Sequence, residues 1–149
     1  NKLDIKKCDF VCGDVKQYLY DLSPIHSQPF QEVSQQVPPK KDSKGVFDVI
    51  ILDPPAFVKD RHKVKEGLMG YKKINEMALR VLQSEGILVS ASCSAHVTLS
   101  DFRFMLSESA GRTRRSLQIL ETHTHGIDHP ELVSFTEGEY LKCLFAKVV

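Results

Sequence analysis

The 149-residue sequence has almost no net charge, no long apolar run and no targeting segment, and each absence excludes a class of protein. The 20 Lys and Arg residues nearly balance the 19 Asp and Glu residues, so we expect no overall electrostatic attraction to nucleic acid. No apolar stretch approaches the ~18 residues of a membrane span, and no signal-peptide pattern is present. We therefore expect a cytoplasmic chain without a membrane partner.

Cysteine is scarce, and its spacing favours neither zinc nor disulfides. Cys8 and Cys12 lie four positions apart, with no second pair or histidine at ligand spacing. His123 and His125 would share one face of a strand without an obvious third ligand, so no metal is expected. Both early cysteines and Cys143 fall in apolar strand patterns, where we expect them to pack in a core in a reducing compartment.

The glycines lack the G-x-G-x-x-G pattern that binds a nucleotide-type cofactor after an early strand. The sequence also begins almost directly before a predicted strand. We therefore expect residues 1–149 to form a single partial domain whose amino-terminal half lies outside this sequence. Within it, the Pro-, Gln- and Ser-rich residues 23–45 predict a flexible loop, either a tolerated insertion or an interaction segment.

What the sequence does contain is an alternation of strand and helix patterns. Val46–Leu52 is an apolar run typical of a strand that is buried on both faces inside a parallel sheet. In chain order we expect a strand at Asp9–Cys12, a helix capped by Asp14, the strand at Val46–Leu52, a helix at Met69–Gln83, a strand at Gly86–Ala91, a helix from Thr98 or Ser100 to Gly111, and strands at Ser116–Thr122 and Tyr140–Val148. This order predicts the carboxyl half of a doubly wound α/β fold, with a mostly parallel sheet and an antiparallel last strand.

Reactive side chains follow two of these strands, at the sheet edge where open α/β folds bind ligands. Asp53 ends the first of them, because Pro54 and Pro55 cannot continue the sheet ladder. Its carboxylate could hydrogen-bond a base or accept a proton, or it could only brace the turn. Cys93 follows the second strand, where its thiolate could act as a nucleophile assisted by His96, or its side chain could simply pack as a small hydrophobe.

Other side chains near these strand ends have two interpretations each. Phe57 could stack on a base or pack against the sheet. Asp14 could accept a hydrogen bond from the amino group of an adenine or serve only as a helix cap. A run of cations could form a local nucleic-acid patch or a solvated loop. Those cations, with one histidine, are Lys59, Arg61, His62, Lys63 and Lys65.

An ordered set of motifs resembles a known family. The segments are Gly13-Asp14, Phe47–Phe57, Gly70–Asn75, Gly86–Leu88, Ser92–Ser94, Asp128–Pro130 and Glu137–Lys142. In that order they resemble the class I S-adenosylmethionine-dependent methyltransferases of the bacterial 23S ribosomal RNA cytosine-5 type. The resemblance implies a Rossmann-like fold, S-adenosyl-L-methionine as cofactor and ribosomal RNA as partner.

The resemblance also implies residue roles. Cys93 would add to carbon-6 of a cytosine, and Asp53 would hold and polarise the ring. The implied cofactor-binding residues are Asp14, Asp53 and Pro54, and the implied substrate-binding residues are Pro55, Phe57 and Tyr71. Many RNA cytosine-5 enzymes carry a second cysteine directly after the Asp-x-Pro turn, where this sequence has Ala56, so Cys93 is the available nucleophile.

Two other functions stay open at this point. An amino- or guanine-directed ribosomal RNA methyltransferase would use the Asp-Pro-Pro turn and leave Cys93 as packing. A non-catalytic RNA-binding fragment would have lost its cofactor-binding half. The formation of a homodimer is also left open.

Overall fold

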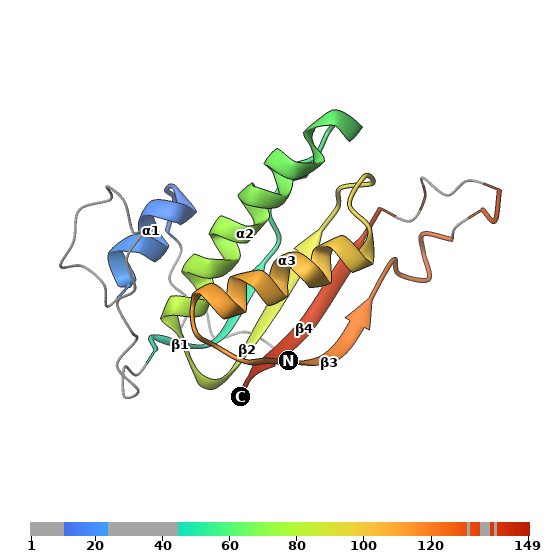
Figure 1. Cartoon of the computed structure of the whole chain (residues 1–149). Coiled ribbons are helices and arrows are strands. Elements are labelled where there is room, and N and C mark those ends of the chain that lie inside the picture. Colours follow the sequence, from blue (N-terminus) through green and yellow to red (C-terminus); the bar gives the residue numbers. More distant parts are fainter. Residues whose placement is uncertain (1–10, 24–44, 131, 135–137, 139) are drawn as a thin grey trace.

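The computed structural model describes residues 11–23, 45–130, 132–134, 138 and 140–149. The elements are α1 (Val15–Leu22), β1 (Phe47–Leu52), the 3₁₀ turn η2 (Arg61–Lys63), α2 (Val64–Val81), β2 (Leu82–Ser92), α3 (Leu99–Arg112), β3 (Leu117–His123) and β4 (Lys142–Val148). The strands form a four-stranded sheet in the order β1-β2-β4-β3 (Figure 1). The β1–β2 pair is parallel, whereas β4 runs antiparallel to both β2 and β3. The expected α/β fold and its antiparallel last strand are confirmed, and the described part of the sheet is mixed.

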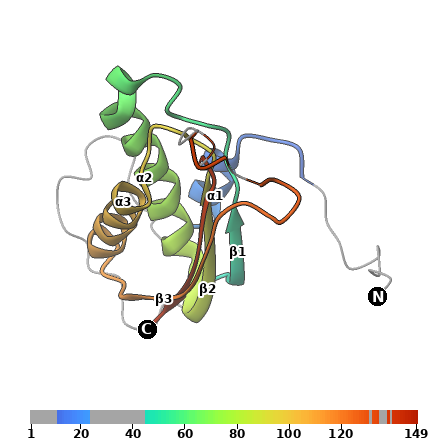
Figure 2. The same cartoon turned by 90° about the vertical axis from the view of Figure 1, so that its right-hand side faces the viewer.

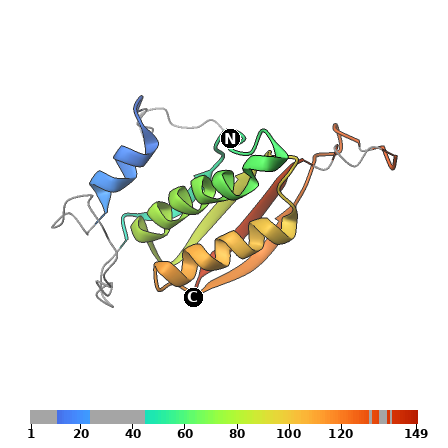
Figure 3. The ribbon, with the colours of Figure 1, turned by 45° about the horizontal axis from the view of Figure 1, so that its top comes forward.

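Helices α2 and α3 lie on the same side of the sheet (Figures 2 and 3). The core is the layer between these helices and the sheet. Its fully buried side chains include Tyr71 and Leu79 from α2, Phe102 from α3, Leu88 from β2 and Leu144 from β4. Along β4 the buried positions alternate with half-buried ones, as expected for a strand with one face against helices. None of the helices in the described ranges is long and apolar enough to cross a membrane.

The opposite face of the sheet carries apolar side chains that the described elements do not cover. Val49 and Ile51 in β1 are 53% and 70% exposed, whereas Ile50 and Leu52 are buried. The prediction that this strand is buried on both faces is therefore wrong for the described structure. The physical reason is that α2 and α3 both pack on one side, so only every second residue of β1 reaches the core.

Helix α2 is longer at its start than predicted, and the segment after it is built differently. The helix begins at Val64 instead of Met69 and ends at Val81. The left-handed backbone (φ 64°) occurs at Glu85, inside β2 where its pairing with β1 shifts register, and not at the neighbouring Gly86. Gly86 is needed for space instead, because a Cβ there would lie 2.9 Å from the carbonyl oxygen of Gln83.

Side chains cap the other two helices, and the cap predicted at Asp14 is present. The Asp14 side chain accepts a hydrogen bond from the backbone N–H of Gln17 at 2.9 Å and starts α1. Thr98 and Asp101 form a capping box at the start of α3. Of the apolar side chains of α1, Leu19 is buried, whereas Val15 and Tyr18 are largely exposed.

Two expectations fall wholly or partly outside the described residues. The predicted strand at Asp9–Cys12 overlaps them only at Val11 and Cys12, which are not in a strand. Cys12 is exposed, so its predicted place in the core is wrong. The predicted flexible loop at residues 23–45, like Cys8, lies almost entirely outside the described ranges.

Candidate active site

Asp53 and Cys93 follow neighbouring parallel strands at the same edge of the sheet. Leu52, the last residue of β1, is level with Ser90 in β2, and Cys93 comes directly after the end of β2. Leu52 and Ser92 are buried against the helices, whereas Asp53 is exposed and Cys93 is half-buried. Because neighbouring parallel strands end at the same edge of a sheet, Asp53 and Cys93 lie at one edge.

The thiol of Cys143 is affected by the charge of Asp53. Cys143 lies in β4 opposite Ala91, on the sheet face away from α2 and α3. Burial raises the pKa of the Cys143 thiol, and the negative charge of Asp53 raises it further. The Asp53 charge therefore influences a thiol on β4, which β2 separates from β1 in the sheet.

A buried hydrogen-bond network fixes the loop that carries Cys93. The Ser94 hydroxyl lies 2.9 Å from the Tyr71 hydroxyl and accepts the backbone N–H of Val58 at 3.2 Å. The Ser94 carbonyl accepts a hydrogen bond from Nζ of Lys142 at 2.7 Å. Both Ser94 and Lys142 are buried. The network joins the loops after β1 and β2 to α2 and β4.

Tyr71 does not present a surface to a substrate in this structure. Its side chain is 0% exposed, and its ring packs against Phe57 at 4.7 Å and against Phe102 at 5.6 Å between centroids. Its hydroxyl bonds to Ser94 and accepts the backbone N–H of Phe57 at 3.4 Å. The substrate contact expected for Tyr71 does not fit this burial, and the residue instead holds the loop after Asp53.

Two glycines of α2 let that loop approach the helix closely. A Cβ at Gly67 would lie 2.2 Å from a Val58 methyl carbon, and one at Gly70 would lie 3.2 Å from the ring of Phe57. The half-buried Phe57 ring therefore lies across the helix, with Nζ of Lys16 5.9 Å from its centroid. The sequence analysis did not predict that Gly67 and Gly70 make room for this loop. Their three-residue spacing, which puts both on one helix face, could have indicated it.

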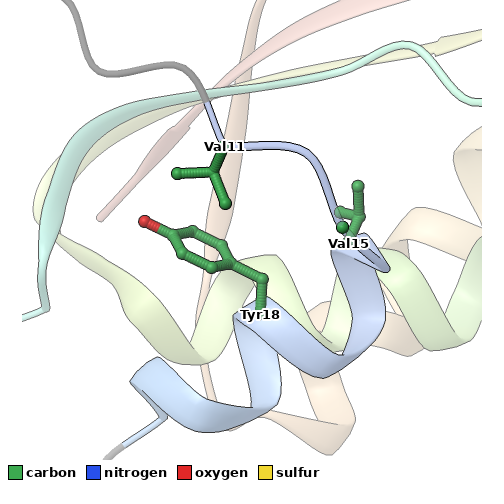
Figure 4. A pocket seen from close by; sticks show the side chains of 4 residues that line it. Val11, Val15 and Tyr18 are labelled. Atoms are coloured by element: carbon green, nitrogen blue, oxygen red, sulfur yellow. The ribbon is translucent and has the colours of Figure 1, made fainter.

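Asp14 lies beside two hollows that α1 helps to line. One, of about 200 Å³, is lined by Val11, Gly13, Val15 and Tyr18 (Figure 4). The other, of about 460 Å³, is lined by Asp14, Lys16, Gln17, Tyr20, Lys73 and Met77. The Asp14 carboxylate is exposed and uses one oxygen, Oδ1, to cap α1. Its second oxygen can accept a further hydrogen bond, so the cap and a ligand contact are compatible.

The remaining candidates differ in exposure. Pro54 is buried, whereas Pro55 is exposed beside Asp53. The predicted cationic run lies in the exposed segment leading through η2 into α2, and none of its lysines or its arginine has an ion-pair partner among the described residues. Among all the residues that the structure describes, no three His, Cys, Asp or Glu side chains lie close enough together to hold a metal ion. His123 instead pairs with Glu121 at 2.6 Å.

The fold of the described residues is similar to that of solved methyltransferase structures. No protein-family model matches the chain. Among solved structures, it superposes on a protein proposed to be a methyltransferase and complexed with SAH, with a TM-score of 0.58 and 25% identity over 70% of this chain and 27% of that one. A protein from Streptococcus mutans, proposed to be a SAM-dependent methyltransferase, gives a TM-score of 0.56 and 26% identity, over 70% and 26%. The sheet therefore has the fold of part of a methyltransferase.

The names of the curated relatives are more specific than those of the solved structures. The chain is 34% identical over 142 residues to "Ribosomal RNA large subunit methyltransferase I" of Cronobacter sakazakii, covering 95% of this chain and 31% of the relative. It is 33% identical over 149 residues to the protein of the same name from Serratia proteamaculans, covering 100% and 33%. The chain thus spans about a third of the length of the curated relatives that it matches.

Proposed function

We propose that this chain is part of an S-adenosylmethionine-dependent methyltransferase that methylates carbon-5 of a cytosine in large-subunit ribosomal RNA, in the cytoplasm. The observation that carries the proposal is the pair Asp53 and Cys93, which directly follow neighbouring parallel strands at one edge of the sheet. The names of the curated relatives support ribosomal RNA as the substrate class.

Carbon-5 of cytosine is a weak nucleophile, and a thiolate provides a way to activate it. The Cys93 sulfur would add to carbon-6, which breaks the 5,6 double bond and makes carbon-5 nucleophilic. S-adenosylmethionine would supply the electrophilic methyl group that carbon-5 takes up, and its sulfonium would leave as the thioether of S-adenosylhomocysteine. A base then removes the proton from carbon-5, the double bond re-forms, and the sulfur–carbon bond breaks to release Cys93.

Asp53 would orient the cytosine for this attack. Its exposed carboxylate can accept a hydrogen bond from the exocyclic amino group of the base. The exposed Pro55 and the half-exposed ring of Phe57 lie on the same loop and would contact the base beside it. Because a stacked base is out of reach, the target nucleotide must be unpaired or flipped out of its helix.

Asp14 would contribute to cofactor binding at the start of α1. One carboxylate oxygen caps the helix, and the other would accept a hydrogen bond from the adenine amino group of S-adenosylmethionine. The neighbouring hollows offer room beside it. Pro54 follows Asp53 directly and would border the cofactor from the strand end.

Methylation of large-subunit ribosomal RNA by the full-length protein, followed by mass spectrometry of the nucleosides, tests this function. The wild type should form 5-methylcytidine, and Cys93→Ala should lower its formation by at least about 1000-fold. Ser109→Ala removes a buried hydroxyl that bonds to Met105 within α3 and serves as the control, with unchanged activity expected.

Three results would contradict all or part of the proposal. A methylated amino group or guanine, formed equally by Cys93→Ala, would indicate an enzyme without a cysteine nucleophile. Formation of 5-methylcytidine by Cys93→Ala would leave the modified base as proposed but remove the covalent step. RNA binding without any methylation or S-adenosylmethionine binding would indicate a non-catalytic RNA-binding protein.

A further inference from the structure

Ser94, the residue directly after Cys93, has every one of its polar groups engaged inside the protein. Its side chain is 1% exposed. Its N–H donates to the Ser92 hydroxyl at 3.3 Å, and its carbonyl accepts Nζ of Lys142 at 2.7 Å and the N–H of Val97 at 3.1 Å. A backbone held at both its N–H and its carbonyl has little freedom, so the peptide that carries Cys93 is fixed from one side.

The hydroxyl of Ser94 extends this restraint to the loop that carries Asp53. It accepts the Val58 N–H at 3.2 Å and shares a 2.9 Å hydrogen bond with the Tyr71 hydroxyl. The Tyr71 hydroxyl in turn accepts the Phe57 N–H at 3.4 Å. Two buried hydroxyl groups therefore connect the loop after β1 to the loop after β2, through a residue anchored in α2.

Lys142 adds a link to a third strand. It is the first residue of β4, pairs with Ser92 in the sheet and is only 4% exposed. An ammonium group buried to this extent requires polar partners, and the Ser94 carbonyl is one of them. The loop after β2 is thus held from α2 on one side and from β4 on the other.

We propose that Ser94, Tyr71 and Lys142 are positioning residues that hold the Cys93 thiol in a fixed place relative to Asp53, without touching the substrate themselves. The inference rests on the proposed function, since it gives these residues a role in that reaction. Small displacements of a reacting group are costly, because about 1 Å of misplacement can lower a rate about 100-fold. The network therefore acts on the rate of the chemical step and not on cofactor binding.

Alkylation of the folded, full-length protein with iodoacetamide tests the restraint without any need for activity. Peptide mass spectrometry reports each cysteine separately, so exposed Cys12 and half-buried Cys143 serve as internal references. The test variants are Tyr71→Phe and Ser94→Ala, which remove single hydroxyl groups. Matched controls are Tyr140→Phe in the exposed segment before β4 and Ser109→Ala, whose buried hydroxyl bonds to Met105 within α3.

We expect the two test variants to raise alkylation of Cys93 about 5-fold, the factor that corresponds to one lost hydrogen bond, while Cys12 and Cys143 react as before. The controls should leave Cys93 unchanged. A parallel rise at Cys93 and Cys143 would mean general loosening and would overturn the proposal. Unchanged alkylation of Cys93 in both test variants would overturn it as well.

Kinetics of the same variants separate this inference from the function on which it rests. Tyr71→Phe and Ser94→Ala should lower kcat about 10- to 100-fold and change the KM for S-adenosylmethionine less than about 2-fold. Faster Cys93 alkylation with an unchanged kcat would refute the positioning role alone. Full activity of Cys93→Ala would refute the cysteine mechanism, while the alkylation result would still decide whether the network holds the loop.

Discussion

Nζ of Lys142 lies 2.7 Å from the carbonyl oxygen of Ser94, so the first residue of β4 is bonded to the loop after β2. The bond crosses the carboxyl end of β2, where the chain leaves the sheet next to Cys93. The same strand carries Lys147, whose side chain reaches the exposed Glu85 at the other end of β2. On one strand, Lys142 therefore makes a buried hydrogen bond and Lys147 makes an ion pair at the surface.

Replacing Lys142 by Ala should destabilise the fold far more than replacing Lys147. The Lys142 change removes a charge-assisted hydrogen bond and the buried packing of the side-chain stem, and we expect the free energy of unfolding to fall by about 2 to 3 kcal/mol. Lys147→Ala breaks a surface ion pair and should cost about 0 to 1 kcal/mol. Urea denaturation measures both, and equal effects of the two changes would contradict this difference.

Alanine at Gly67 and at Gly111 should change stability in opposite directions. A Cβ at Gly67 would lie 2.2 Å from the Val58 side chain and 3.0 Å from the Phe57 carbonyl oxygen, whereas one at Gly111 meets nothing within 4 Å. We expect Gly67→Ala to lower the free energy of unfolding by about 1 to 3 kcal/mol through overpacking. Gly111→Ala should raise it by about 0.5 to 1 kcal/mol through helix propensity. Thermal or urea unfolding decides, and a stabilised Gly67→Ala would show that the loop after β1 is not tightly packed on α2.

Asp53→Asn should make the thiol of Cys143 more reactive. The negative charge of Asp53 disfavours the thiolate and raises the pKa of Cys143, so its removal lowers that pKa although burial still keeps it above the ordinary value. At pH 8 the thiolate fraction then rises, and alkylation of Cys143 should be faster. Asp48→Asn, an exposed carboxylate earlier on the same strand, is the control and should change nothing. An unchanged rate at Cys143 in Asp53→Asn would mean that the two side chains do not interact.

The sequence predicted the positions of strands and helices better than it predicted which of their side chains are buried. The apolar run before Asp53 and the helical pattern that begins at Thr98 or Ser100 are local signals, so β1 and the start of α3 were expected at nearly the right residues. Burial depends on what packs against a face, which is why Val49 and Ile51 were expected inside and are exposed. Gly67 and Gly70 weaken the helix signal locally, and only contact with the loop at Phe57 explains why they lie within α2.

The site shows the same division between local and long-range information. Asp53 and Cys93 could be identified because each directly follows a strand, and parallel strands end at the same edge. The hydrogen bonds that hold the loop at Cys93 could not be identified from the sequence. The partners of Ser94 are Val58, Tyr71 and Lys142, which are 23 to 48 positions away. Serine and lysine at such positions usually indicate solvent contact, and only the fold reveals that they are buried.

The exposed cations around η2 should contribute to RNA binding through phosphate contacts. They follow the Asp53 loop directly, and no described acidic side chain forms an ion pair with them. Replacing Lys63 and Lys65 together by Gln should weaken RNA binding by the full-length protein and reduce the slope of log K against log salt by about 1.4, or about 0.7 per lost contact to a single strand. The double change Arg114→Gln with Lys147→Gln removes the same charge at the far ends of α3 and β4, so it should leave the slope unchanged. Equal slopes for the two double variants would show that the segment is only a solvated loop, because a diffuse effect of net charge would act on both alike.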